Sequence, residues 1–287
     1  MFLASSWFGH RARDLPAQIR LAAEFRFAGI CLLPGAEPPE RVDLLPADRP
    51  SSIGAVSWDA LAPSPPPGSQ PVPVWSRHTF SAVRTQLAAL RCSLLILPVG
   101  ADLQADAPGR GERLLGRIRA GETLRDDEAL EELRILEGSA AESQLETLAA
   151  LLHEFLHHAP DLRVALAPGP SPAALLTPNR MRLLLAEIRH PGLGLWHDSA
   201  DSETRATSGL PPAGAWLDAF GGRIFGVTLH DFAAGRDHLP PGTGIVDWPL
   251  LAEYLPRSAL RVLQLAPSYP DTLLTEARSL LTAHRLI

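Results

Sequence analysis

The sequence contains no lysine: all 26 of its basic residues are arginine. Aldolases that form a Schiff base and enzymes that use pyridoxal phosphate need a lysine amine as nucleophile or anchor. Nucleotide-binding P-loops need a lysine beside the phosphates. The absence of lysine therefore excludes these three classes of protein.

The sequence is also poor in cysteine, in long apolar runs and in clustered positive charge. Its two cysteines, Cys31 and Cys92, lie in apolar segments and are expected to be reduced core residues. No apolar run reaches the roughly 18 residues of a membrane-spanning helix, and the first residues lack the pattern of a signal peptide. The formal net charge is −6 and no basic block occurs, which argues against a nucleic-acid partner. We therefore expect a cytoplasmic protein.

Short apolar, β-prone runs alternate along the chain with longer segments of helical period. Strands are predicted at 1–6, 29–34, 51–57, 93–99, 163–168, 192–198, 223–231 and 260–266. Helices are predicted at 14–28, 79–90, 143–158, 172–189, 212–220, 247–255 and 271–284, with Asp14, Ser81 and Asp247 as helix starts. Near-continuous apolar strands between helices indicate a parallel sheet that is covered on both faces.

Eight such units predict an α/β fold, a single (β/α)8 TIM barrel spanning 1–287. A doubly wound open sheet is the alternative, but no glycine-rich fingerprint follows the first strand. Two segments are predicted as insertions: the proline-rich 61–75 and the charged 100–140. Both follow the carboxyl ends of strands. They are expected either to cover the barrel mouth or to be solvated additions to it.

The segment HEFLH at 153–157 matches H-E-x-x-H, a pattern that places two zinc-binding histidines one helical turn apart with a glutamate base. The predicted helix buries an apolar stripe made of Leu145, Leu148, Leu152, Phe155 and Leu156. His153 and His157 flank this stripe and no third ligand is evident. We therefore expect a solvated helix face rather than a metalloprotease site.

Polar side chains gather where the last strands end, which is where functional residues of parallel barrels usually lie. The candidates on the sixth predicted strand and just beyond it are Trp196, His197, Asp198 and Asp201. The alternation of the seventh strand puts Thr228 and His230 on one side, followed by Asp231, Asp237 and His238. The eighth strand contributes Gln264.

The segments GLGLWHDSAD (192–201) and VTLHDFAAGRDHLPPGTGIVDW (227–248), with the order of strands, resemble the sugar-phosphate isomerase/epimerase family of xylose-isomerase-like barrels. Endonuclease IV is a more distant relative of that family. The resemblance implies a divalent metal held by Glu, Asp, His and Glu, the two Glu also moving protons. Matched by position, these four fall at Ala167, Asp198, Thr228 and Gln264.

Only the aspartate of that ligand set is retained. Alanine has no donor atom, and glutamine cannot accept a proton at neutral pH. His230 lies two residues beyond the lost histidine, so a rebuilt zinc or manganese site would use Asp198, His230 and His238 as ligands, with Asp201 or Asp237. One alternative is a mouth without metal, in which these side chains hydrogen-bond to one another. The other is carbohydrate binding or catalysis without a metal.

These observations predict a sugar or sugar-phosphate isomerase/epimerase-like protein with an altered metal site and a small carbohydrate as its partner. The predicted catalytic residues are His230 and Asp198, and the predicted substrate-binding residues are Trp196, Asp201, Asp231 and Gln264. One alternative is a non-catalytic descendant that binds a ligand or another protein. The other, a phosphodiesterase like endonuclease IV, would need a basic surface and more ligands.

Overall fold

The eight predicted strands form a closed parallel barrel. The computed structural model describes residues 1–33, 52–61, 77–99, 139–171, 174–207 and 209–287, with a few isolated positions between 113 and 122. Around the barrel the strands follow the order β1, β10, β7, β6, β5, β4, β3 and β2, and every neighbouring pair is parallel. This order is that of a (β/α)8 barrel, so the predicted fold class is confirmed.

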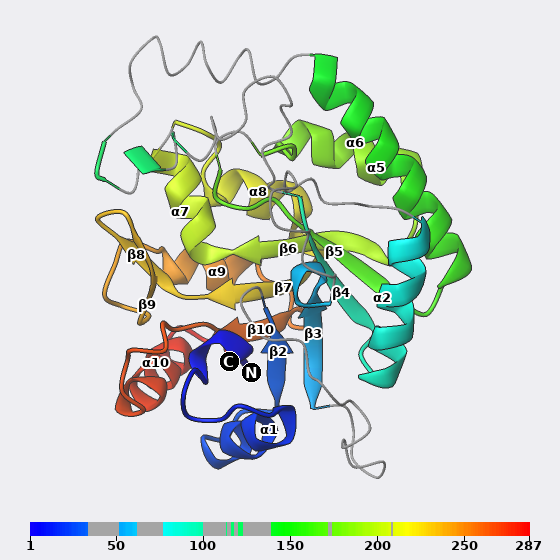
Figure 1. Ribbon diagram of the computed structural model, residues 1–287. Helices are drawn as coiled ribbons and strands as arrows, with labels where there is room; N and C mark the ends of the chain where they lie inside the picture. Colours follow the sequence, from blue (N-terminus) through cyan, green and yellow to red (C-terminus); the bar gives the residue numbers. More distant parts are fainter. Residues whose placement is uncertain are drawn as a thin grey trace.

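The strands are short and most are followed by a helix (Figure 1). The barrel strands are β1 (Phe2–Ala4), β2 (Ile30–Leu32), β3 (Ile53–Ser57), β4 (Leu94–Pro98), β5 (Arg163–Ala167), β6 (Leu193–Asp198), β7 (Ile224–Leu229) and β10 (Leu260–Leu263). The described α-helices are α1 (Leu15–Glu24), α2 (Arg77–Ala89), α5 (Ser139–His158), α6 (Pro178–Ile188), α7 (Ser199–Thr207), α8 (Ala213–Phe220), α9 (Trp248–Tyr254) and α10 (Thr272–Ala283).

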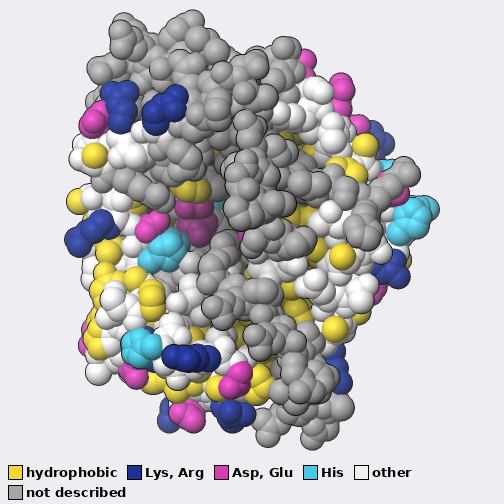
Figure 2. All heavy atoms as spheres, viewed as in Figure 1, with side chains coloured by type: hydrophobic (Ala, Val, Ile, Leu, Met, Phe, Trp, Pro, Cys, Tyr) yellow, Lys and Arg dark blue, Asp and Glu magenta, His cyan; other side chains and the backbone are white. Residues whose placement is uncertain are grey.

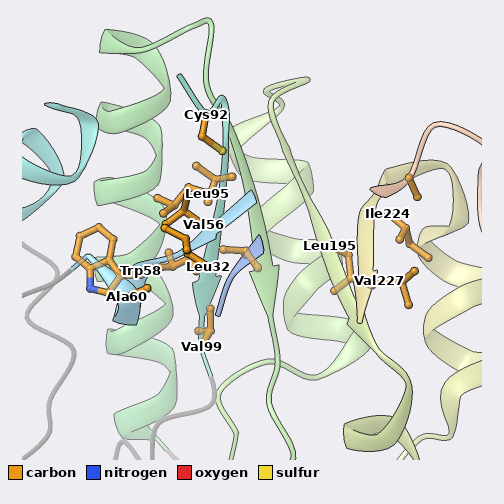
Figure 3. Close-up of a cluster of buried hydrophobic side chains, with 14 of the residues drawn as sticks. Leu32, Val56, Trp58, Ala60, Cys92, Leu95, Val99, Leu195, Ile224 and Val227 are labelled. Carbon is orange, nitrogen blue, oxygen red and sulfur yellow. The ribbon is translucent and has the colours of Figure 1, made fainter. Parts of the chain in front are cut away.

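Alternate side chains of each strand enter two separate apolar clusters. On β4, Leu95 and Leu97 join the large cluster between the strands and the helices, while Leu94 and Ile96 point into the barrel. Figure 3 shows part of the large cluster, with Leu95 beside residues of β2 and β3. The inner cluster consists of Ala4, Cys31, Leu33, Ala55, Leu94, Ile96, Ala165, Trp196 and Val262. Both clusters consist of buried apolar side chains, which hold the strand ends in fixed positions.

Some helix starts agree with those predicted from the sequence, and others differ from them. The Asp14 carboxylate accepts the backbone N–H of Ala17 at 2.7 Å, and Asp247 caps α9 in the same way. The prediction of a helix start at Ser81 was wrong, because α2 begins at Arg77. Helix α7 was not predicted from the sequence. The antiparallel hairpin at the end of β7, made of β8 (Asp231–Ala233) and β9 (Arg236–Leu239), was not predicted either.

The two predicted insertions, 61–75 and 100–140, lie almost wholly outside the described residues. Whether they cover the mouth therefore stays a prediction. Within the part of the chain that the structure describes, no helix has the length and apolar character needed to cross a bilayer.

Candidate functional site

The polar side chains predicted from the sequence come together at the carboxyl ends of β6, β7 and β10. Asp198, the last residue of β6, is the register partner of Thr228 on β7. The backbone N–H of Gln264, just after β10, donates to the carbonyl of Leu229 at 3.1 Å. The hairpin β8–β9 then folds back over these ends. The barrel thus brings residues that are distant in sequence to one edge.

His230 and Asp198 form a buried pair at this edge. The Nε2 atom of His230 lies 3.0 Å and 3.1 Å from the two carboxylate oxygens of Asp198. The Nδ1 atom of His230 accepts the backbone N–H of His238 at 2.9 Å. Since an N–H cannot donate to a protonated nitrogen, the proton of the neutral imidazole belongs on Nε2. His230 is therefore a donor to Asp198.

His238 reaches the mouth from the hairpin in an unusual backbone conformation. Its φ of 57° is left-handed, which is uncommon for a residue other than glycine. Its ring stacks on that of His230, with centroids 4.6 Å apart and planes 15° from parallel. Its Nδ1 lies 2.9 Å from an Asp237 carboxylate oxygen, and its Nε2 lies 2.7 Å from the Gln264 amide nitrogen. Three neighbours thus fix the orientation of this half-exposed imidazole.

The two aspartates beside His230 differ in charge state. Burial opposes ionisation of Asp198, but His230 and the backbone N–H of Asp201 outweigh it and hold the pKa of Asp198 well below its ordinary value. For Asp201, burial and the nearby Asp198 charge raise the pKa to about 8. An ionised and a protonated carboxyl group therefore stand side by side near neutral pH.

The centre of the barrel below this edge is filled by an indole ring. Trp196 is buried in the inner cluster, and its Nε1–H donates to the Thr228 hydroxyl at 2.7 Å. Gly226 makes room for the ring, since a Cβ at that position would lie 2.2 Å from it. The prediction that Trp196 binds substrate is not supported by this arrangement, in which the side chain packs and bonds internally.

Asp231, a further predicted substrate-binding residue, also has a different role here. Its carboxylate is fully buried and accepts backbone N–H groups of Phe232, Gly242 and Val246 at 2.9, 2.8 and 3.1 Å. These three bonds tie the loop 240–246 to the end of β7. Asp231 therefore shapes the rim of the mouth, and its buried carboxylate does not face a ligand.

The arrangement does not fit the metal ion that the family resemblance implies. Both nitrogens of His230 are engaged, one by a donor N–H and one by Asp198. A metal on Nε2 would require the proton on Nδ1, where it would face the N–H of His238. The Thr228 hydroxyl accepts from Trp196, and Ala167 is apolar. Among the described residues, no three His, Cys, Asp or Glu side chains are placed to share an ion.

Two further residues that were not predicted from the sequence support the mouth. The Ser199 hydroxyl accepts the backbone N–H of His230 at 3.1 Å and lies 2.6 Å from its carbonyl, joining α7 to β7. Arg205 is buried behind the aspartates and donates to the Gly169 carbonyl at 2.7 Å. Asp201 and Arg205 are one helical turn apart, and this spacing could have identified them as neighbours from the sequence. It could not be used because helix α7 itself had not been predicted.

The polar cluster is accessible from outside. The side chains of Asp237 and His238 are each 34% exposed, and that of Asp198 is 20% exposed. Figure 2 shows acidic side chains next to a histidine on this face, near α7 and the hairpin. The described part of the mouth is therefore a small acidic patch with imidazole at its edge.

Comparison with known proteins gives matches in structure alone: no protein-family model and no curated protein matches the sequence. An L-ribulose 3-epimerase superposes with a TM-score of 0.60 at 15% identity, over 100% of this chain and 95% of that one. The chain has the xylose-isomerase-like TIM-barrel fold. A 3-keto-D-glucoside 4-epimerase from E. coli is similar to this barrel, with a TM-score of 0.60 at 12% identity over 95% of each chain.

A structural neighbour with a different kind of name also matches this barrel. A probable 3-DHS dehydratase from Bacillus anthracis matches with a TM-score of 0.59 at 15% identity, over 98% of both chains. Epimerases and a dehydratase thus share the fold, which fixes the scaffold and leaves the reaction to the side chains at the mouth.

Proposed function

We propose that this barrel binds a small, uncharged sugar at its acidic mouth and isomerises or epimerises it by proton transfer without a resident metal. The observation that carries the proposal is the convergence of Asp198, Asp201, His230 and His238 at the ends of β6 and β7. The sugar epimerases among the structural neighbours support the substrate class.

The chemistry of the patch suits a polyhydroxylated ligand. An ionised Asp198 accepts hydrogen bonds from hydroxyl groups, and a protonated Asp201 donates one. Because Asp237 adds a third carboxyl group, the described patch repels a phosphate group. An uncharged aldose or ketose therefore fits better than a sugar phosphate.

Proton transfer needs an acid and a base near the same carbon atom. Asp201, whose pKa of about 8 lies near neutral pH, is suited to donate and to take back a proton. The imidazole of His238 lies where the family resemblance places a proton-moving Glu, because its Nε2 is 2.7 Å from the Gln264 amide nitrogen. These two groups are the proposed proton carriers, His238 once a bound ligand displaces the Gln264 amide from its Nε2, with His230 and Asp198 orienting the ligand.

A sugar-binding protein without catalysis is the second candidate. The packing of Trp196 against Thr228 favours it, since the axis of the barrel is filled where the resemblance implies a metal. Such a protein would bind the same ligands at the same patch but leave their C–H bonds intact.

The test is incubation of the protein with each common aldopentose, aldohexose and corresponding ketose in D2O, followed by proton NMR. Exchange of a C–H for deuterium is expected for at least one sugar. The exchange should be lost in Asp201→Asn and retained in Asp218→Asn, an exposed position on α8. Saturation transfer to a sugar without exchange would select the second candidate. Neither binding nor exchange across the panel would contradict both.

A further inference from the structure

Helix α5 exposes two histidines that the proposed function does not use. His153 and His157 are exposed, while Leu152, Phe155 and Leu156 on the same turns are buried. The expectation that the two histidines flank the apolar stripe is thus confirmed. The buried stripe attaches the helix to the barrel, so the two imidazoles project from a well-anchored backbone.

The two imidazoles lie one helical turn apart and are already parallel. Their centroids are 6.5 Å apart and their planes are 5° from parallel. Within the described part of the chain, neither ring has a hydrogen-bond partner, so each has a nitrogen lone pair to offer. The next ring, that of His158, is edge-on to His157 and directs its Nδ1 to the Glu154 carbonyl at 2.8 Å.

Imidazole nitrogen is a good ligand for zinc, nickel and copper ions. Side chains four residues apart on a helix have Cβ atoms about 5–6 Å apart, a separation that lets both rings turn onto one ion. Two protein ligands leave the remaining positions to water, so such a site is weaker than a structural zinc site. It also lacks the third protein ligand of catalytic zinc enzymes.

We infer that His153 and His157 form a surface site for a first-row transition-metal ion, separate from the barrel mouth. Figure 1 shows α5 on the opposite side of the molecule from the β8–β9 hairpin. The H-E-x-x-H spacing, which does not make a metalloprotease here, thus makes a two-histidine chelate. The metals bind in the order copper above nickel and zinc, as their general affinities for nitrogen ligands dictate.

The test is calorimetric titration of the metal-stripped protein with Cu²⁺, Ni²⁺ and Zn²⁺ in a buffer that does not bind metals. One equivalent of Cu²⁺ is expected at α5. His153→Ala and His157→Ala should each weaken it about a hundredfold, since a chelate loses the effective concentration of its second ligand. His10→Ala, which removes a single exposed histidine, should leave the affinity unchanged.

A relocated histidine tests the geometry itself. The double variant Thr147→His with His157→Ala keeps the number of histidines on α5 but places them six residues apart, on different faces, and should bind as weakly as His157→Ala. Thermal melts check that these exposed substitutions leave the fold intact. The inference is overturned if the relocated pair binds like wild type, if His10→Ala weakens binding equally, if Asp198→Ala abolishes it, or if no ion binds.

Discussion

The backbone N–H of His238 donates to Nδ1 of His230 across 2.9 Å, and this bond determines what His230 can do. It requires a lone pair on Nδ1, so the ring carries its proton on Nε2 and directs it at Asp198. Protonation of the second nitrogen, or a metal on Nε2, would each cost the bond to His238. The hairpin β8–β9, which follows His230 in sequence, thus determines which ring nitrogen of His230 carries the proton.

We expect the NMR spectrum of protein labelled with ¹⁵N-histidine to show the proton of the His230 ring on Nε2, the atom that faces Asp198. Its signals are assigned by their loss in His230→Gln. An equivalent of Zn²⁺ should leave them unshifted, even though zinc shifts the exposed histidines of α5. A proton on Nδ1 would contradict the hydrogen-bond pattern, and a zinc-induced shift of the His230 signals would support the predicted metal site.

The Trp196–Thr228 bond predicts different effects of two conservative changes. Thr228→Val removes the acceptor of a buried indole N–H and should lower the free energy of unfolding by about 1–3 kcal/mol. Thr228→Ser keeps the hydroxyl and should cost less than Thr228→Val. Urea denaturation measures both. No loss in Thr228→Val beside a loss in Thr228→Ser would show that the hydroxyl contributes nothing and that only packing matters.

Asp231 should be more important for stability than for ligand binding. Its carboxylate accepts three backbone N–H groups, and Asp231→Asn replaces one acceptor oxygen by an NH2 group that faces a donor. Loss of hydrogen bonds to a charged group costs about 1.5–3 kcal/mol each. Hydrogen exchange should show faster opening at Gly242 and Val246 in the variant. Unchanged exchange there would contradict the proposed role in holding the rim.

The barrel could be predicted because its signals are local. Strand β5, for example, is a short apolar run between two helices, and in a closed barrel both of its faces are buried: Val164 and Leu166 face the helices and Ala165 faces the axis. The alternation on β7 likewise placed Thr228 and His230 on one side, as the structure has them. Periodicity and burial alone determine such features.

The roles of individual site residues could not be predicted in the same way. Nothing in the sequence shows that the indole of Trp196 reaches Thr228, 32 positions away, or that His238 adopts a left-handed backbone. The helix α7 begins directly after β6 with the sequence SADSETRAT, which has too few apolar residues to give a helical period. Contacts between distant segments decide these points, and a single sequence does not contain them.

The buried imidazole of His197 predicts sensitivity to acid. Burial, with the nearby charge of Arg205, lowers the pKa of His197 to about 4, against about 6.5 in an unfolded chain. As the pH falls, the unfolded chain takes up a proton at His197 before the folded protein does. The stability that comes from keeping His197 neutral is therefore complete above pH 6.5 and is lost as the pH falls towards 4. His197→Phe should therefore lose less stability than wild type between pH 6.5 and pH 5 in urea denaturation. Parallel losses in the two proteins would exclude His197 as the cause.

Asp201 predicts the opposite dependence at higher pH. Its pKa of about 8 in the folded protein exceeds the value of about 3.9 in an unfolded chain, so the folded state holds a proton that the unfolded state has released. Stability should therefore fall as the pH rises to about 8, by at most about 1.4 kcal/mol per pH unit from this group. Above pH 6.5 the effect of His197 is no longer present to offset it.

The variant Asp201→Asn mimics the protonated carboxyl group and should remove this decline. Urea denaturation at pH 6.5, 7.25 and 8 is expected to show a falling free energy of unfolding in wild type and a flatter profile in the variant. Asp218→Asn, on the exposed face of α8, should follow wild type. If Asp201→Asn declines as steeply as wild type, Asp201 is ionised in the folded protein and is not the proton donor that the proposed sugar chemistry requires.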